Sequence, residues 1–154
     1  MTKQLNDGSS AIVLEIKDLS EVVKEIHDQS VHMEEAYRLT VVNKENTFTV
    51  VITGQTDAGV FYGLQSLLNL LEGSDNGRRM PMVHVVDAPR FQYRGLMVDV
   101  SRNFVTKDVI LQTLDVMAMY KMNKFHFHLT DDQGWRFEVP WLPELVEVGY
   151  NRKT

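Results

Sequence analysis

The sequence YRGLMVDV at residues 93–100 and the sequence FHFHL at residues 125–129 decide the fold of the second half of this chain. Both are short apolar runs of the kind that buried strands show. Residues 106–120, between them, carry apolar side chains at helical spacing, and Thr106 is suited to cap a helix there. The apolar positions of this helix are Ile110, Leu114 and Met117.

A strand, a helix and a second strand at this spacing form a βαβ unit, whose two strands run parallel. Parallel strands need cover on both faces, as in a TIM (β/α)8 barrel. A closed barrel takes roughly 250 residues, and far fewer separate Tyr93 from the final residue, Thr154. We therefore predict that residues 89–154 are the truncated opening of a TIM barrel.

Residues 1–88 show a different pattern, with strands predicted over 11–16, 36–42, 47–53 and 80–86 and a helix over 56–71. These elements predict an α+β domain, an antiparallel sheet with a helix on one face. The helix is expected to bury a stripe formed by Val60, Phe61, Leu64, Leu67, Leu68 and Leu71. The Asp87-Ala88-Pro89-Arg90 segment is the predicted boundary.

Composition excludes several classes of function. The 154 residues carry a net charge of −5 and no basic stripe, so no nucleic-acid partner is expected. No apolar run is long enough to span a membrane. The absence of cysteine rules out disulfides and thiolate zinc sites.

The carboxyl ends of parallel strands are where α/β folds place their working residues. Two such ends are predicted here. The residues that follow or end these strands are Asp99, Ser101, Arg102 and Asn103 in the first case, and His126, His128, Asp131, Asp132 and Trp135 in the second.

Several of these residues have two interpretations. Asp131 and Asp132 are adjacent, so they should point to opposite sides and not act as a pair, and either could simply cap loop amides. His126 and His128 project to one face of a strand, where they either chelate a metal with Asp131 or are held inside a barrel by hydrogen bonds. Trp135 is either a platform for a sugar or a buried loop tryptophan.

Arg94, at the start of the first barrel strand, also has two interpretations. A guanidinium is costly to bury alone, so it either pairs with a carboxylate such as Asp132 or Asp99 or reaches a ligand. Its planar fork of donors suits two neighbouring hydroxyls as well as a carboxylate.

Residues 94–104 (RGLMVDVSRNF) and 119–136 (MYKMNKFHFHLTDDQGWR) together resemble the first two barrel strands of the hexosaminidases of glycoside hydrolase family 20. Residues 35–39 and 58–67 resemble the non-catalytic α+β domain that precedes the barrel in that family. The resemblance covers nearly the whole chain and is weakest over residues 1–30. It implies that the α+β domain is incomplete at its amino end.

The resemblance implies a β-N-acetylhexosaminidase, which removes terminal N-acetylglucosamine or N-acetylgalactosamine from β-linked glycans by a substrate-assisted, retaining mechanism. The family's acid and its acetamido-orienting residue form an Asp-Glu dipeptide. This sequence contains no such dipeptide, so the chain alone is expected to be inactive. By family, the location would be periplasmic, extracellular or lysosomal.

The resemblance also assigns roles. It implies that Arg94 binds the 3- and 4-hydroxyls of the sugar and that Asp131 orients a later histidine behind the acid. Asp132, in a supporting role, His128 and Trp135 are further candidates for substrate contacts. No metal and no cofactor are implied, and the expected partner is an N-acetylhexosamine-containing glycan.

Two alternatives to a hexosaminidase remain at this point. The chain could open a metal-dependent TIM-barrel hydrolase, or its α+β half could be a non-catalytic carbohydrate-binding module. Because the barrel opening lacks its neighbouring strands, its apolar faces are expected to promote self-association.

Overall fold

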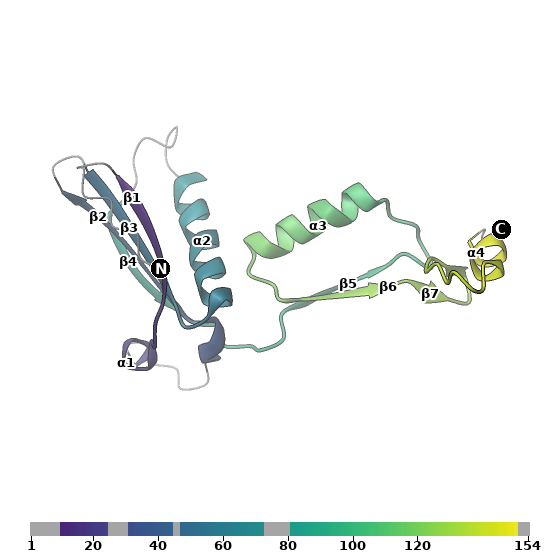
Figure 1. Cartoon of the computed structure of the whole chain (residues 1–154), viewed down its shortest axis with the longest axis horizontal. Helices are drawn as coiled ribbons and strands as arrows, with labels where there is room; N and C mark the ends of the chain where they lie inside the picture. The colour runs from purple at the N-terminus through teal and green to yellow at the C-terminus, as the bar shows by residue number, and fades with distance from the viewer. Residues whose placement is uncertain (1–9, 25–30, 45–46, 73–80, 151–154) are drawn as a thin grey trace. The chain divides into compact units, whose positions relative to one another are not determined.

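The computed structural model describes residues 10–24, 31–44, 47–72 and 81–150. The chain divides into two compact units, residues 1–92 and residues 93–154 (Figure 1). Among the described helices, none is both long enough and apolar enough to cross a membrane.

The first unit is a four-stranded sheet with a helix on one face (Figure 1). Its elements are β1 (Ala11–Ile16), α1 (Ser20–Val23), the 3-10 helix η1 (Met33–Glu35), β2 (Tyr37–Lys44), β3 (Thr47–Gly54), α2 (Asp57–Glu72) and β4 (Val83–Asp87). The strand order is β1-β3-β2-β4.

The α+β class is confirmed, but the prediction of a wholly antiparallel sheet was wrong. β2 pairs antiparallel with both β3 and β4, whereas β1 lies parallel to β3. Residues 17–36, which include α1 and η1, connect β1 to β2, and this is long enough for a crossover that brings β1 beside β3 in the parallel sense. A strand's own sequence does not show the direction of its neighbour.

The core of this unit lies between the sheet and α2. Tyr37, Leu39 and Val41 alternate along β2 and are buried, as their period of two predicts. From α2, Tyr62 and Leu67 are buried, and Val60, Leu64 and Leu71 pack against them. Gly59 permits this packing, because a Cβ there would lie 2.2 Å from the Ala36 carbonyl oxygen.

Two residues of the predicted helical stripe do not belong to the core. Phe61 is 44% exposed and Leu68 is 50% exposed. They lie seven residues apart, so they share a side of α2 next to the one that faces the sheet. From an apolar residue in the sequence we expect burial, but the sequence does not say which element buries it.

The second unit contains β5 (Gly95–Asp99), α3 (Lys107–Met119) and β6 (Lys124–His128). β5 and β6 are parallel, which confirms the predicted βαβ unit. Ile110 and Met117 are the buried residues of α3. Thr106 occupies the N-cap position, but its side chain makes no capping hydrogen bond.

Three further elements follow β6 and were not predicted from the sequence. β7 (Thr130–Asp131) and β8 (Gly134–Trp135) form a short antiparallel hairpin, and α4 (Glu144–Gly149) comes after it. Both strands have only two residues, which is too short for a periodic pattern to reveal them.

Candidate functional site

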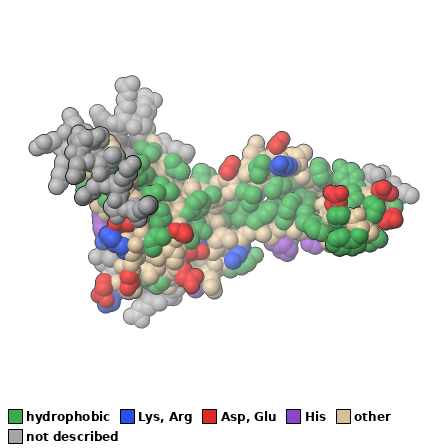
Figure 2. Space-filling view, viewed as in Figure 1, with side chains coloured by type: hydrophobic (Ala, Val, Ile, Leu, Met, Phe, Trp, Pro, Cys, Tyr) green, Lys and Arg blue, Asp and Glu red, His purple; other side chains and the backbone are tan. Residues whose placement is uncertain are grey.

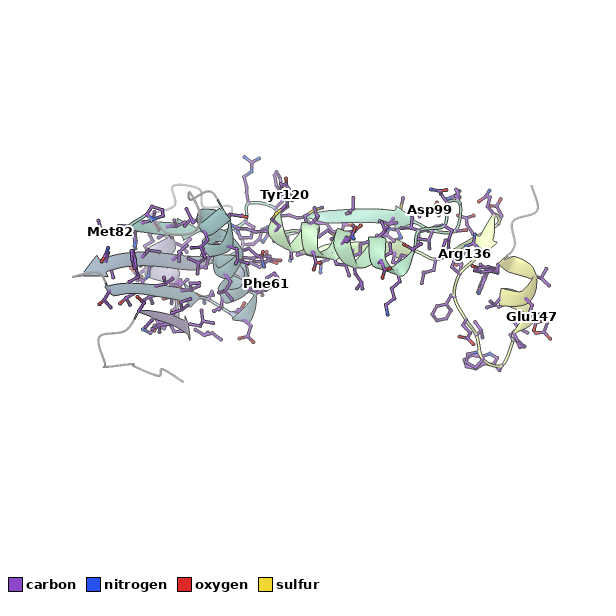
Figure 3. The ribbon with its side chains drawn as sticks, turned by 90° about the horizontal axis from the view of Figure 1, so that it is seen from above. Phe61, Met82, Asp99, Tyr120, Arg136 and Glu147 are labelled. Atoms are coloured by element: carbon purple, nitrogen blue, oxygen red, sulfur yellow. The ribbon has the colours of Figure 1, made fainter. Side chains whose placement is uncertain are left out.

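The carboxyl ends of β5 and β6 meet at one edge, because the strands are parallel and in register. Asp99 lies opposite His128 in this register. Figure 3 shows Asp99 and Arg136 toward this end of the pair and Tyr120 toward the other. The β7–β8 hairpin begins two residues after β6 and adds Asp131 to the same edge.

The Asp131 carboxylate is the centre of this group. Its Oδ2 lies 2.8 Å from Nε2 of His128 and 2.6 Å from Nη2 of Arg102. Its Oδ1 accepts a hydrogen bond of 2.8 Å from the backbone N–H of Asp132. The structure therefore joins residues from both predicted strand ends through one carboxylate.

These contacts fix the charge of Asp131. The backbone N–H of Asp132 and the side chain of His128 both donate to the carboxylate and hold its pKa at about 2, below the ordinary value of 3.8. The positive charge of Arg102 acts in the same direction. Asp131 is thus an anion suited to orient a donor, and not an acid suited to give up a proton near neutral pH.

Arg102 bridges two carboxylates. Its Nη1 lies 2.6 Å from Oδ2 of Asp99, while its Nη2 contacts Asp131. Asp99 also accepts the backbone N–H groups of Ser101 and Arg102, each at 3.0 Å, and the bonds from Arg102 lower the Asp99 pKa. The Arg102 side chain as a whole is about half exposed.

Asp132 also interacts with this group, because a hydrogen bond to its side chain helps to lower the pKa of Asp131 and its charge helps to raise the pKa of Arg102. Trp135 lies beside the group. The side chain of Asp132 is exposed, whereas that of Asp131 is 25% exposed. The indole Nε1 of Trp135 donates to the Phe137 carbonyl at 2.5 Å, so its polar edge is used within its own loop.

The structure places Arg94 away from this edge, at the amino end of β5. Its Nε donates to the Lys121 carbonyl at 2.8 Å, and its backbone N–H donates to the side chain of Asn123 at 3.1 Å. Both partners lie in the turn before β6. A strand of five residues spans about 16 Å, so Arg94 and Asp131 lie at opposite ends of the β5–β6 pair.

The two carboxylates suggested as partners of Arg94, those of Asp99 and Asp132, both lie at the carboxyl end of the pair. Asp99 pairs with Arg102 instead. Among the two arginines, Arg102 at the end of the first strand is the one whose planar fork of donors meets carboxylates.

Comparison with known proteins now identifies the family. Residues 91–154 match the glycosyl hydrolase family 20 catalytic domain, and residues 3–88 match domain 2 of that family. The chain belongs to glycosyl hydrolase family 20.

Two relatives show how far the similarity extends. The chain is 59% identical over 103 residues to an N,N'-diacetylchitobiase of Vibrio harveyi, which covers 67% of this chain and 12% of the relative. It is 51% identical over 116 residues to a beta-hexosaminidase B of Pseudoalteromonas piscicida, covering 75% of this chain and 14% of the relative. The chain therefore spans only about an eighth of the length of these proteins.

Solved structures of the family share the fold. A chitobiase of Flavobacterium johnsoniae superposes with a TM-score of 0.70 at 34% identity, over 96% of this chain and 21% of that one. The agreement includes the barrel opening, so the parallel β5–β6 pair is the start of the family 20 TIM barrel.

The two histidines of this family 20 segment are the side chains that the sequence offered as metal ligands with Asp131. His126 and His128 share a face of β6, with ring centroids 6.1 Å apart, and Figure 2 shows histidine side chains on the side of the strands away from α3. Nε2 of His128 is already engaged with Asp131. Within the described residues, no three histidine or carboxylate side chains are grouped to hold a metal ion.

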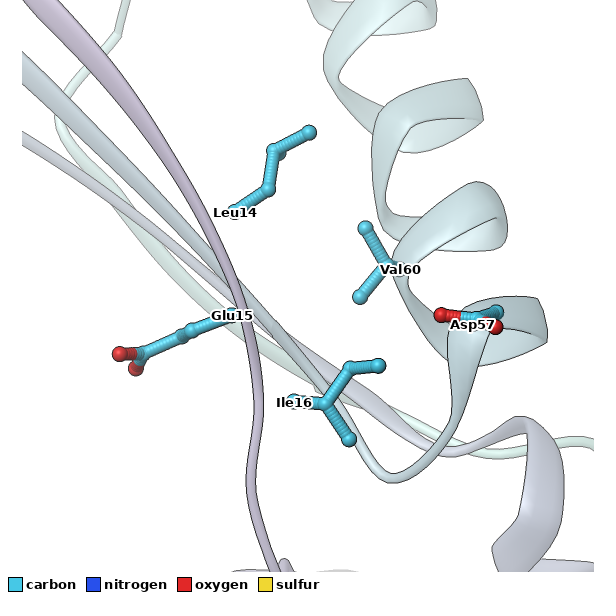
Figure 4. A pocket seen from close by; sticks show the side chains of 5 residues that line it. All are labelled: Leu14, Glu15, Ile16, Asp57 and Val60. Atoms are coloured by element: carbon cyan, nitrogen blue, oxygen red, sulfur yellow. The ribbon is translucent and has the colours of Figure 1, made fainter. Parts of the chain in front are cut away.

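The α+β unit contains a separate pocket of about 390 Å³ between β1 and α2. Figure 4 shows Leu14, Ile16 and Val60 directed toward one another, while the Glu15 side chain points away. Asp57 completes the lining, which includes no aromatic ring. The lining thus combines three aliphatic side chains with two acidic residues.

Proposed function

We propose that the complete protein containing this chain is a β-N-acetylhexosaminidase, which releases terminal N-acetylglucosamine or N-acetylgalactosamine from β-linked glycans. Family membership and the names of its relatives support this proposal. The observation that carries it is the Asp131 carboxylate, which is held between His128 and Arg102 at the carboxyl edge of the first two barrel strands.

The roles of individual residues are part of the proposal. Asp131 stays ionised and orients a histidine behind the acid, which lies on a later strand. Arg102, in place of Arg94, contacts the sugar hydroxyls with the exposed part of its side chain, while its fork bridges Asp99 and Asp131. His128, Asp132 and Trp135 border the substrate, with Asp132 in a supporting role. The mechanism needs no cofactor, because the substrate's own acetamido oxygen attacks the anomeric carbon.

An assay of the complete enzyme tests this function directly. The enzyme should release the chromophore from a β-N-acetylglucosaminide, and proton NMR should detect the β-anomer of the sugar first, because substrate assistance retains configuration. Initial release of the α-anomer, or loss of activity on treatment with a chelator, would contradict the proposal and favour a metal-dependent hydrolase.

We also propose that residues 1–88 form a non-catalytic α+β domain and residues 89–154 the opening of the barrel. The two compact units and the two family matches support a boundary in this region. Sugar binding by residues 1–88, measured by calorimetry, would instead support the carbohydrate-binding alternative.

We further propose that the isolated chain self-associates. In the second unit Leu96, Met97 and Phe127 are 38%, 54% and 39% exposed, although barrel strands normally have both faces covered. Sedimentation of the chain should show oligomers that bind a dye for apolar surfaces. A monodisperse monomer that binds no dye would contradict this.

A further inference from the structure

Arg136, directly after β8, makes more connections than any role assigned so far explains. Its backbone N–H donates to the Leu129 carbonyl at 2.9 Å. Its side-chain Nε donates to the Val100 carbonyl at 3.1 Å, and its Nη1 donates to the Tyr150 carbonyl. One residue therefore links the ends of β5 and β6 to the segment after α4.

Two aromatic rings hold the guanidinium in place. Its Cζ lies 5.7 Å from the ring centroid of Phe104 and 5.1 Å from that of Tyr150. The rings also contact each other edge to face, with centroids 6.4 Å apart. A planar cation between two rings has little freedom to turn, so its donors keep a fixed direction.

Ser101 supplies a second link between the same two loops. Its buried hydroxyl donates to the Gly134 carbonyl at 2.6 Å. Only glycine fits at position 134, because a Cβ would lie 2.8 Å from the Ser101 carbonyl oxygen and 3.0 Å from Nη2 of Arg136. The hairpin and the loop after β5 thus lie in close contact.

These two loops carry the two partners of the central ion pair. The loop after β5 carries Arg102, and the hairpin carries Asp131, which lies opposite Gly134 in the β7–β8 register. The 2.6 Å contact between Arg102 and Asp131 therefore depends on how the hairpin lies against the loop.

We propose that Arg136 is a positioning residue for the catalytic site, which fixes the β7–β8 hairpin against the loop after β5 and so sets the position of Asp131. This inference rests on the proposed function for its kinetic consequences. Arg136 itself touches neither Asp131 nor Arg102 through any contact described above, so it acts through the backbone of both loops.

The test compares Arg136→Met with Arg136→Lys in the complete enzyme. Met removes every donor, whereas Lys keeps a cation near the rings but loses the fork. Arg90→Met is the matched control, because it removes an arginine that lies 4.6 Å over the Phe91 ring in the other unit. Kinetic constants are normalised to folded enzyme, measured by circular dichroism.

We expect Arg136→Met to lower kcat by about 10- to 100-fold, as a displacement near 1 Å can do, with a small change in KM. The kcat of Arg136→Lys should lie between that of Arg136→Met and that of the wild type. The carboxyl carbon of Asp131, followed by NMR, should titrate at higher pH in Arg136→Met, because Asp131 loses well-placed donors. Ser101→Ala should also lower kcat. In the double variant, the loss of kcat should be smaller than the product of the two single losses.

The inference is overturned if kcat per folded molecule and the Asp131 titration both match the wild type, or if Arg90→Met causes the same changes. Should Arg136→Met fail to fold, Arg136→Lys decides by the same two measurements. If the wild type has no hexosaminidase activity, the proposed function fails, and the Asp131 titration alone decides whether Arg136 positions this carboxylate.

Discussion

Arginines lie at both ends of the β5–β6 pair, and the surroundings of Arg102 differ from those of Arg94. At the carboxyl end, Arg102 bridges the carboxylates of Asp99 and Asp131 at 2.6 Å each. At the amino end, Arg94 donates to a backbone carbonyl and meets the side chain of Asn123 through its own backbone. The first arrangement concentrates charge at the strand ends, and the second links β5 to the turn before β6.

The turn at the amino end has its own local requirement. Lys121 adopts a positive φ of 56°, which is uncommon for a residue with a side chain. Its carbonyl is the acceptor for Arg94. The two arginines thus differ in their contacts, and we expect their roles to differ in the same way. The following predictions test that contrast, from the largest expected effect to the smallest.

The 154-residue chain by itself should have no glycosidase activity, although the residues at the carboxyl end of its β5–β6 pair are in contact with one another. It contains no Asp-Glu dipeptide, and general acid catalysis alone contributes about 10² to 10⁴ in rate. The assay is release of chromophore from a β-N-acetylglucosaminide by the purified chain, with the complete enzyme as control. Turnover that co-purifies with the chain would show that this end is sufficient.

Arg102→Lys in the complete enzyme should lower kcat/KM by roughly 10- to 100-fold, because the variant keeps the charge but loses the fork. Arg94→Lys is the matched control and should change kcat/KM much less. Both variants are measured on one substrate series that differs at the 4-hydroxyl. A larger loss for Arg94→Lys would reverse the assignment of the two ends.

Asp131→Asn should lower kcat by roughly tenfold and leave KM nearly unchanged, because Asp131 orients another residue and does not hold the sugar. The pKa of Asp131 is lowered from 3.8 to about 2, so its contribution is complete above about pH 4 and is lost as the pH falls toward 2. The difference between wild type and variant should therefore be constant above pH 4 and shrink below it. A change confined to KM would contradict this role.

Arg94→Lys should have its main effect on stability, and this is the smallest change expected. Loss of the hydrogen bond to the Lys121 carbonyl should lower the free energy of unfolding by about 0.5–1.5 kcal/mol. Urea denaturation of the complete enzyme measures it, with Lys107→Arg at the exposed start of α3 as a control. If the variant is as stable as the wild type but binds substrate more weakly, Arg94 contacts the substrate after all.

Much of the architecture could be predicted because it follows from periodicity. The alternation of Tyr37, Leu39 and Val41 marked a half-buried strand. The spacing of Ile110, Leu114 and Met117 marked a helix, although Leu114 is 39% exposed. The two-residue strands of the hairpin could not be found in this way. The parallel direction of β1 could not be found either, because register and direction depend on the neighbour.

The candidate site was predictable in part. Strand-end logic selected Asp99, Arg102, His128 and Asp131, and the structure brings these four together. Arg136 was quoted only as the end of a motif. Its one signal in the sequence was its place next to the aromatic Trp135, which does not reveal a stack on Phe104 and Tyr150.

By itself, the sequence determined the fold class, the family and the kinds of side chain at the site, because these depend on local pattern and on motifs read along the chain. Only the tertiary structure decided which arginine serves which end, which carboxylate it meets and what holds the hairpin in place. Those outcomes depend on distances between residues that are far apart in the chain. Arg102 and Asp131, for example, are separated by 29 positions in the sequence. Such distances are set by strand direction and packing, which no local pattern encodes.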